Sequence, residues 1–258
     1  MREVPAEPSR FRTGCAGWSL PRASWPEFAG HGTHLQRYAG RLSAVEINSS
    51  FYRPHLSATY ARWAASVPAG FRFSVKLPMA VTHERRLRGC DPLIDAFLDQ
   101  TAGLGARLGC LLAQLPPSLA FDATAAQDFF SAVRARHAGA VALEPRHASW
   151  FGPEADAMLV AQRIARVLAD PVRHLAGAAP GGWPGLVYLR LHGSPRMYYS
   201  SYEPSMLDAL AQRIRLAAQS TNDVWCIFDN TAAGAAIGNA LDLSQHLEVM
   251  SPALRGTG

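Results

Sequence analysis

Lysine is almost absent from this sequence. Of the 25 lysine and arginine residues in the 258-residue chain, Lys76 is the only lysine and the other 24 are arginine. Arginine is forked and never neutral, so it cannot replace a compact ammonium group or a nucleophilic amine. Because arginine occupies every other basic position, we expect position 76 to require an ammonium group.

Long apolar runs and paired cysteines are also missing. No stretch reaches the roughly 18 uninterrupted apolar residues typical of a membrane helix. No apolar segment follows the charged first ten residues, so a signal peptide is not expected. The four cysteines, at positions 15, 90, 110 and 226, show no CxxC spacing. These absences predict a cytoplasmic protein without membrane contact, whose cysteines are small buried residues.

Metal-ligand clusters and a glycine-rich nucleotide motif are absent too. The nine histidines are spread out, with no HxH or HxxxH pair at the end of a strand-like run. We therefore expect no cofactor and no metal. One ion held by Glu46, Glu144 and His192 is the alternative that stays open. No GxGxxG follows the first strand-like run, which argues against an open doubly wound sheet, the alternative fold.

Positive charge is in modest excess. The formal net charge is +5, and Arg85, Arg86 and Arg88 form the only local basic cluster. Scattered positive charge is weak support for nucleic-acid binding, so nucleic acid enters only as an alternative partner.

What the sequence does contain is a recurring alternation of β-rich and helical segments. Eight β-rich runs begin near positions 11, 43, 71, 108, 140, 165, 186 and 224. Helical patterns lie between or after them at 33–40, 57–66, 92–104, 124–137, 154–162, 204–219 and 234–247, while the Gly/Pro-rich segment 177–185 leaves room for only a short helix. This pattern predicts an α/β fold of the TIM type, a (β/α)8 barrel with a closed parallel eight-stranded sheet. We expect one domain over 11–250, with a flexible tail at 1–10 and another at 251–258.

The period of a strand predicts which side chains enter the barrel. In the run 71–77, apolar residues alternate with Arg72, Ser74 and Lys76, so Lys76 points inward if helices cover the outside. The same rule places these side chains inside: Glu46, Asn48, Gln114, Glu144, Tyr188, Arg190 and His192. In the eighth run either Asp229 or Asn230 faces in. Carboxyl-terminal strand ends are where such barrels build their sites.

Several of these stretches resemble the YecE-like family, domain of unknown function 72 (DUF72). They are 14–18 (GCAGW), 45–52 (VEINSSFY), 71–76 (FRFSVK), 82–83 (TH), 114–117 (QLPP), 144–150 (EPRHASW), 188–193 (YLRLHG), 229–231 (DNT) and 239–240 (NA). The resemblance implies a TIM-type barrel, related in shape to sugar isomerases and to a barrel class of DNA-repair endonucleases, without an established activity. Asp229 departs from the asparagine that is more usual in the family, which puts in doubt any role for a neutral amide there.

The resulting site hypothesis has two groups of residues. Glu46, Lys76, Glu144 and His192 are the candidate catalytic residues. The candidate ligand-binding residues are Asn48, Tyr52, Arg146, His147, Arg190 and Asn230. Lys76 and Arg190 would hold an anion while His192 or a glutamate moved a proton. We therefore expect a barrel that binds, and hydrolyses or isomerises, an anionic ligand that bears phosphate or resembles a sugar.

Several alternatives stay open at this point. Glu46 and Glu144 lie on strands that would allow glycoside-like hydrolysis, and a desolvated Lys76 would suit a Schiff base. The basic cluster with exposed tyrosines would suit a nucleic-acid-binding or endonuclease-like barrel. The protein would also fit a non-catalytic ligand-binding scaffold, or the charges would form an internal ion network that needs no ligand.

Overall fold

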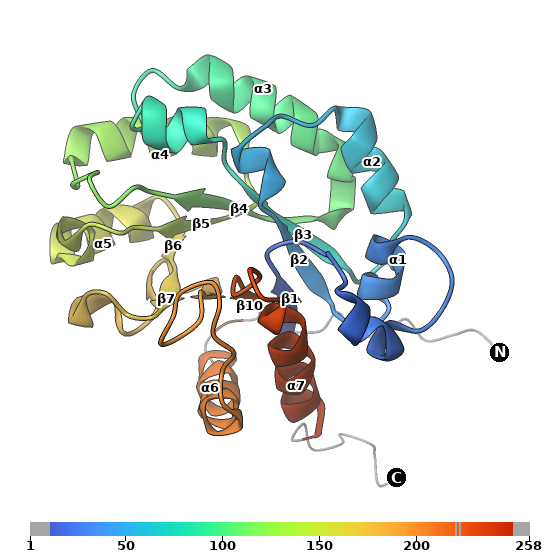
Figure 1. Cartoon of the computed structure of the whole chain (residues 1–258). Coiled ribbons are helices and arrows are strands. Elements are labelled where there is room, and N and C mark those ends of the chain that lie inside the picture. The colour runs from blue at the N-terminus through green and yellow to red at the C-terminus, as the bar shows by residue number, and fades with distance from the viewer. Residues whose placement is uncertain (1–10, 220, 222, 250–258) are drawn as a thin grey trace, which may run out of the picture.

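The computed structural model describes residues 11–219, 221 and 223–249 (Figure 1). The tails expected at 1–10 and 251–258 lie outside these residues, as does residue 250 at the expected end of the domain. Within the described ranges, no helix is both long enough and apolar enough to cross a bilayer.

The described residues form ten strands in two sheets. The smaller sheet has the order β1 (Phe11–Cys15), β10 (Val224–Phe228), β9 (Val187–Leu191), β7 (Leu168–Asp170). The larger sheet has the order β2 (Ala44–Ile47), β3 (Arg72–Lys76), β4 (Leu108–Gln114), β5 (Ala140–Glu144), β6 (Ile164–Arg166), β8 (Gly181–Gly182). Neighbouring strands are parallel except β6 and β8. The sequence predicted these positions, but it predicted neither the division of the sixth run at Val167 nor the short β8.

Two contacts link the sheets. Ala16, which follows β1, forms a parallel bridge with Glu46 of β2. Strands β6 and β7 are separated only by Val167, and β6 pairs with β5 whereas β7 pairs with β9. The predicted α/β class, with mainly parallel strands in one domain, is therefore confirmed.

Helices surround the strands in Figure 1, with α6 and α7 on the side opposite α3 and α4. They are α1 (His34–Ala39), α2 (Ser57–Ala65), α3 (Asp91–Thr101), α4 (Ala123–Arg136), α5 (Pro153–Ala161), α6 (Pro204–Ala217) and α7 (Ala235–Val249). Shorter helical segments are η1 (Arg22–Phe28), η2 (Ser49–Phe51), η3 (Ala80–Glu84), η4 (Ala102–Arg107), η5 (Ala148–Phe151) and η6 (Leu175–Gly177). Between β7 and β9 the chain forms one short helical segment, η6, as the Gly/Pro-rich sequence indicates.

Local sequence signals explain where these helices start. The side chain of Thr33 accepts a hydrogen bond from the backbone N–H of Gln36, whose own side chain accepts one from the Thr33 backbone, forming a capping box before α1. Asp122 caps α4 in the same way by accepting from the N–H of Ala125. Proline begins α5 and α6, where its missing N–H costs nothing.

Alternating side chains divide the core into two layers. The outer layer lies between the strands and the helices and contains most of the buried apolar residues. The inner layer is a separate, smaller cluster that consists of Ala44, Cys110, Leu112, Ala142, Ala165, Val167, Leu186, Tyr188, Trp225 and Ile227. The rings of Tyr188 and Trp225 are stacked, with centroids 5.8 Å apart. All four cysteines are buried and free, as predicted.

Candidate functional site

Arg190, on β9, lies at the centre of a buried group of charges. Its Nε donates to Glu46 Oε2 at 3.0 Å and its Nη2 to Glu46 Oε1 at 2.7 Å, so the pair is bidentate. Its Nη1 donates to Glu144 Oε2 at 2.9 Å, and Nη2 lies 3.0 Å from Asp229 Oδ2. Burial lowers the pKa of Arg190, but the three carboxylates outweigh it and hold the pKa well above its ordinary value. One guanidinium therefore joins strands β2, β5 and β9 and the end of β10.

His192, just after β9, is held between two of these carboxylates. Its Nδ1 lies 3.0 Å from Asp229 Oδ2, and its Nε2 lies 3.1 Å from Glu144 Oε1. Burial lowers the pKa of His192, but the two carboxylates outweigh it and raise the pKa above its ordinary value. Since both nitrogens face acceptors, the doubly protonated imidazolium satisfies this arrangement. Burial in turn raises the pKa of Glu144, and the opposing charges of Arg190 and His192 bring it well below its ordinary value.

Arg146, two residues beyond the end of β5, completes the network at its outer edge. Its Nε donates to Glu144 Oε1 at 3.0 Å, and its Nη2 lies 2.9 Å from the same oxygen. Three carboxylates, those of Glu46, Glu144 and Asp229, thus face three cations, Arg190, Arg146 and protonated His192. With His192 protonated, the state that its raised pKa favours, the charges of this network cancel.

Polar contacts below the network connect it to the apolar interior. The hydroxyl oxygen of Tyr188 lies 3.1 Å from Glu46 Oε2 and 2.9 Å from Ser74 Oγ. Glu46 and Ser74 are register partners on β2 and β3, and both are completely buried. The register of these two strands therefore fixes the orientation of the Glu46 carboxylate.

Lys76, the last residue of β3, lies beside the network without joining it. Its side chain is buried, and Nζ lies 4.0 Å from the centroid of the Phe51 ring. Across the described part of the chain, Nζ makes no hydrogen bond and no ion pair. Burial, followed by the positive charge of Arg190, lowers the pKa of Lys76 to about 8, against the opposing effect of the carboxylates. When protonated, Lys76 is a positive charge that the network does not balance.

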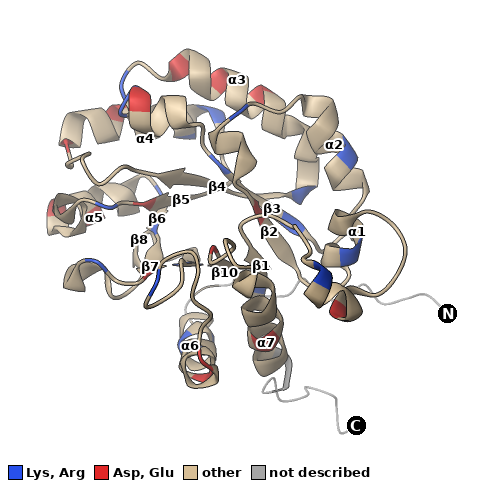
Figure 2. Ribbon diagram, viewed as in Figure 1, with Lys and Arg blue, Asp and Glu red and all other residues tan. Residues whose placement is uncertain are grey.

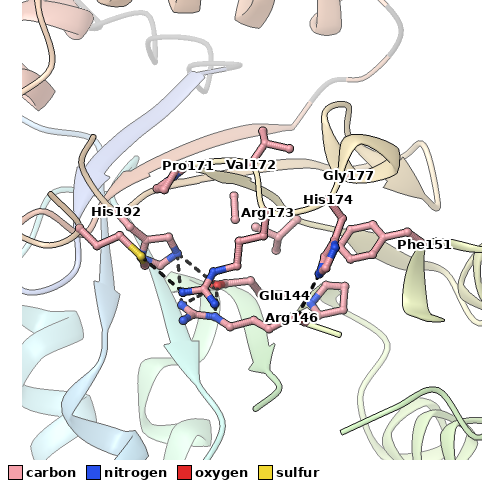
Figure 3. Close-up of a pocket in the computed structure, with 13 residues that line it drawn as sticks. Glu144, Arg146, Phe151, Pro171, Val172, Arg173, His174, Gly177 and His192 are labelled. Carbon is pink, nitrogen blue, oxygen red and sulfur yellow. Dashed lines mark hydrogen bonds and ion pairs between the residues drawn. The ribbon is translucent and has the colours of Figure 1, made fainter. Parts of the chain in front are cut away.

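A small hollow of about 30 Å³ opens beside the network (Figure 3). Glu144, Arg146 and His192 form part of its wall, and Arg173 and His174 of the segment after β7 form another part. In Figure 3 the Arg173 side chain extends toward Arg146 and His192. The Arg173 side chain makes a weak hydrogen bond, from Nη2 to the thioether sulfur of Met197 at 3.5 Å. The hollow is therefore bordered by cationic groups at the carboxyl ends of the strands.

The structure brings five of the sequence-predicted residues into one network and places a sixth beside it. The five are Glu46, Glu144, Arg146, Arg190 and His192, and the sixth is Lys76. Asn48 follows β2 one residue after the register pair Ile47–Val75, at the level of Lys76, and its buried Oδ1 has no hydrogen-bond partner in the described residues.

The other predicted residues lie apart from the network. Tyr52 is 72% exposed and packs edge-on against Phe51. His147 caps η5, accepting a hydrogen bond from the N–H of Ser149. Asn230 is buried, but its Nδ2 donates to Ser200 O and Asn239 Oδ1 and thus ties down the loop after β9.

Asp229 is the network residue that the sequence-based site hypothesis did not include. The sequence left the phase of the eighth strand open between Asp229 and Asn230. In the structure Trp225 and Ile227 of β10 belong to the inner layer, and Asp229 continues the same alternation. Because residues 224–228 (VWCIF) are apolar on both faces of the strand, alternation alone could not separate the two positions.

The basic cluster at 85–88 lies outside this site. Arg86 donates to Ser118, and Arg88 pairs with Asp122 at 2.7 Å on the surface. Figure 2 shows both signs of charge spread over the helices. In the described ranges, no three His, Cys, Asp or Glu side chains are arranged to hold a metal ion. Arg190, Arg146 and Asp229 already engage the polar atoms of Glu46, Glu144 and His192.

Comparisons with known proteins agree with this geometry at the level of the fold. The family model described as protein of unknown function DUF72 matches residues 12–256. DUF72 proteins of Enterococcus faecalis V583 and Thermotoga maritima MSB8 have solved structures with TM-scores of 0.78 and 0.76 and sequence identities of 22% and 24%. Each alignment covers 92% of this chain, with 95% of the first and 99% of the second structure.

Curated relatives give a similar result. The UPF0759 protein YunF of Bacillus subtilis (strain 168) is 22% identical over 267 residues, which cover 92% of this chain and 94% of YunF. The UPF0759 protein YecE of Escherichia coli (strain K12) is 35% identical over 98 residues, which are 38% of this chain and 36% of YecE. The chain thus aligns with about a third of the length of YecE, and the family model supplies the match over nearly its full length. This chain therefore belongs to the DUF72 family, whose members are described as proteins of unknown function.

Proposed function

We propose that this protein binds a small anionic molecule, phosphate-bearing or sugar-like, at the carboxyl ends of its strands, between Lys76 and the hollow that Arg146 and Arg173 border. The observation that carries the proposal is the uncompensated charge of Lys76. Lys76 is 5% exposed and its ammonium group is unpaired within the described residues, while the adjacent ion network is neutral when His192 is protonated. An anion would supply the missing partner.

The charge balance supports an anion over a neutral ligand. An unpaired buried ammonium is unfavourable, so a ligand that neutralises it gains more there than it would at an exposed lysine. Arg173 adds a second cation at the rim, where its side chain donates a weak hydrogen bond to the thioether sulfur of Met197. Guanidinium groups bind phosphate and carboxylate in a forked geometry that an ammonium group lacks.

The same contacts make glycoside-like hydrolysis by Glu46 and Glu144 a poorer proposal. That reaction needs one carboxylic acid that is protonated at working pH. Arg190 binds both carboxylates, and the pKa of Glu144 lies well below its ordinary value because Arg190 and His192 outweigh burial. If the protein turns its ligand over, Glu144 would act as a base or an electrostatic anchor, and Lys76 or His192 would carry the proton.

We also propose that the two sheets form one closed barrel of the TIM type, which would make this site a barrel mouth. The continuous course from β6 through Val167 to β7 supports one seam, because this stretch pairs with β5 and then with β9. The bridge between Ala16 and Glu46 supports the other. An experimental structure lacking hydrogen bonds at either seam would contradict the closed arrangement.

Thermal denaturation against a ligand panel tests the binding proposal. The panel contains inorganic phosphate, sugar phosphates, nucleotides, neutral sugars, short DNA and short RNA at two salt concentrations. At ~100 times its dissociation constant, a ligand adds ~2.7 kcal/mol of stability, or ~5–10 °C for a chain of this size. We expect such a shift with a small anion, lost in Lys76→Met and weakened in Arg173→Gln.

Arg62→Gln is the matched control, since Arg62 is exposed on α2 and its side chain makes no hydrogen bond or ion pair with the described residues. This variant should keep the full shift. A shift found only with DNA or RNA, and fading as salt rises, would replace the proposal with nucleic-acid binding. If no compound shifts the melting temperature, an internal ion network without a ligand explains these charges better.

A further inference from the structure

The surroundings of Lys76 suit an amine better than a permanent ammonium. Lys76 is only 5% exposed and makes no hydrogen bond or ion pair from Nζ within the described ranges. Nζ lies over the Phe51 ring, 4.0 Å from its centroid. At a pKa of about 8, roughly a tenth of the molecules carry the neutral amine at pH 7. An exposed lysine carries it in far fewer than a hundredth of the molecules.

A neutral imidazole lies on the same aromatic ring. His83 belongs to η3, which follows β3 almost directly, and its ring centroid is 5.0 Å from that of Phe51. Its Nδ1 lies 2.8 Å from the hydroxyl of the fully buried Thr82, and Nε2 makes no further hydrogen bond in the described part of the chain. Burial, then the charges of Lys76 and Arg146, lower the pKa of His83, so the ring can accept a proton at neutral pH.

We infer that Lys76 forms a Schiff base with its ligand, that the ligand is an aldehyde or ketone bearing a phosphate or carboxylate, and that His83 transfers protons to and from Lys76. This inference rests on the proposed function and names the substrate class of the same site. The anionic group would lie toward Arg146 and Arg173, which line the hollow, and the carbonyl carbon would approach Nζ of Lys76. A lysine is required for this chemistry because a guanidinium stays protonated, which agrees with the single lysine among 25 basic residues.

The reaction balances without an oxidant or a reductant. His83 takes one proton from the Lys76 ammonium, and the freed nitrogen pair attacks the carbonyl carbon while the C=O π electrons move to oxygen. A nitrogen-bound proton passes to that oxygen to give the carbinolamine. His83 then returns its proton to the hydroxyl, the C–O bond breaks, and water leaves as the C=N bond forms. The sum is ammonium plus carbonyl to protonated imine plus water.

The ring of Phe51 fits both ends of this step. An aromatic face stabilises a cation over it, whether ammonium or protonated imine. The ring is 8% exposed and contacts Lys76, His83 and Tyr52, so it also shields the imine from bulk water. The neighbouring carboxylates, with Arg190 between them, stay engaged in their own network and do not quench the imine.

Reductive trapping tests the inference on the full-length protein. The protein is incubated at pH 7 with pyruvate or dihydroxyacetone phosphate and sodium cyanoborohydride, and the adduct is located by intact mass and peptide mapping. Since Lys76 is the only lysine, the mapping needs to separate it only from the terminal α-amino group. We expect one adduct on Lys76 from at least one of the two compounds, and no internal adduct in Lys76→Met.

The matched control moves the single lysine to the surface. In the double variant Lys76→Met with Arg62→Lys, the new lysine is exposed on α2, and trapping there should be at least ten times slower than at Lys76. His83→Gln should slow trapping at Lys76 several-fold while leaving the thermal shift by inorganic phosphate unchanged. Equal rates at positions 76 and 62, or no adduct on Lys76, overturn the inference. If phosphate still shifts the melting temperature in that case, anion binding stands and only the Schiff base fails.

Discussion

Arg190 and Glu46 form a bidentate pair that is closed to solvent, with hydrogen bonds of 3.0 and 2.7 Å between residues 144 positions apart in the sequence. The pair crosses the interior from β9 to β2. The remaining contacts of Arg190, to Glu144 and Asp229, turn the pair into a network that involves four strands. Folding must therefore be nearly complete before any of these charges is neutralised.

Removing Arg190 should cost much of the stability of the protein. Arg190→Gln leaves three buried carboxylates facing only Arg146 and His192, and breaking a buried ion pair from one side costs ~3–5 kcal/mol. Urea denaturation measures the free energy of unfolding. The control is Arg88→Gln, which removes a surface pair with Asp122 and should cost less than ~1 kcal/mol. Similar losses in the two variants would mean that the network contributes little.

His192 should make stability depend on pH above its unfolded pKa. Its pKa is raised in the folded state because two carboxylates outweigh burial, so its contribution is fully present below ~6.5 and is lost as pH rises through the folded value. The difference in unfolding free energy between wild type and His192→Gln should therefore shrink from pH 6 to pH 9. Denaturant titrations at several pH values measure it, and a difference that grows over this range would contradict the protonated assignment.

Lys76 should have the opposite effect at higher pH. Its folded pKa of about 8 lies below the unfolded value of ~10.4, so the unfolded chain binds more protons between these values and stability rises with pH there. The gain is up to ~3 kcal/mol relative to Lys76→Met, because each unit of difference is worth ~1.4 kcal/mol. The charged groups that act on Lys76 are Arg190, Glu46, Glu144 and Asp229. A flat difference between the two proteins from pH 8 to pH 10 would show that the amine is not desolvated.

Asp229→Asn should unbalance the network by one positive charge. It replaces the carboxylate beside His192 Nδ1 and Arg190 with a neutral amide, so the pKa of His192 should fall. The extra positive charge should also tighten binding of an anion several-fold. Nuclear magnetic resonance titration of the His192 ring reports the first effect, and thermal shifts with inorganic phosphate report the second. Asp122→Asn, on the surface, is the control, and an unchanged His192 pKa in Asp229→Asn would contradict the assigned hydrogen bond.

The sequence by itself determined the strands and most of the inward side chains. Strand alternation is a local property with a period of two residues, so Lys76, Glu46, Glu144, Arg190 and His192 could be placed inside from short apolar patterns alone. The same rule fails where both faces of a strand are apolar, as in residues 224–228, which is why Asp229 and Asn230 could not be separated. It also does not extend to loops, and Tyr52 and His147 were assigned to the site although one is exposed and the other caps η5.

Only the tertiary structure decided which charges meet. The partners of Arg190 come from strands far apart in the sequence, and their pairing depends on register and sheet order, which no local pattern encodes. The division of the sixth strand at Val167 is likewise a choice between two neighbouring strands. The sequence could single out Lys76 as the only lysine. That Nζ of Lys76 has no partner among the described residues is seen only in the structure, where Arg190, Arg146 and His192 bind the surrounding carboxylates. Charge compensation in a buried site is a property of three-dimensional contact.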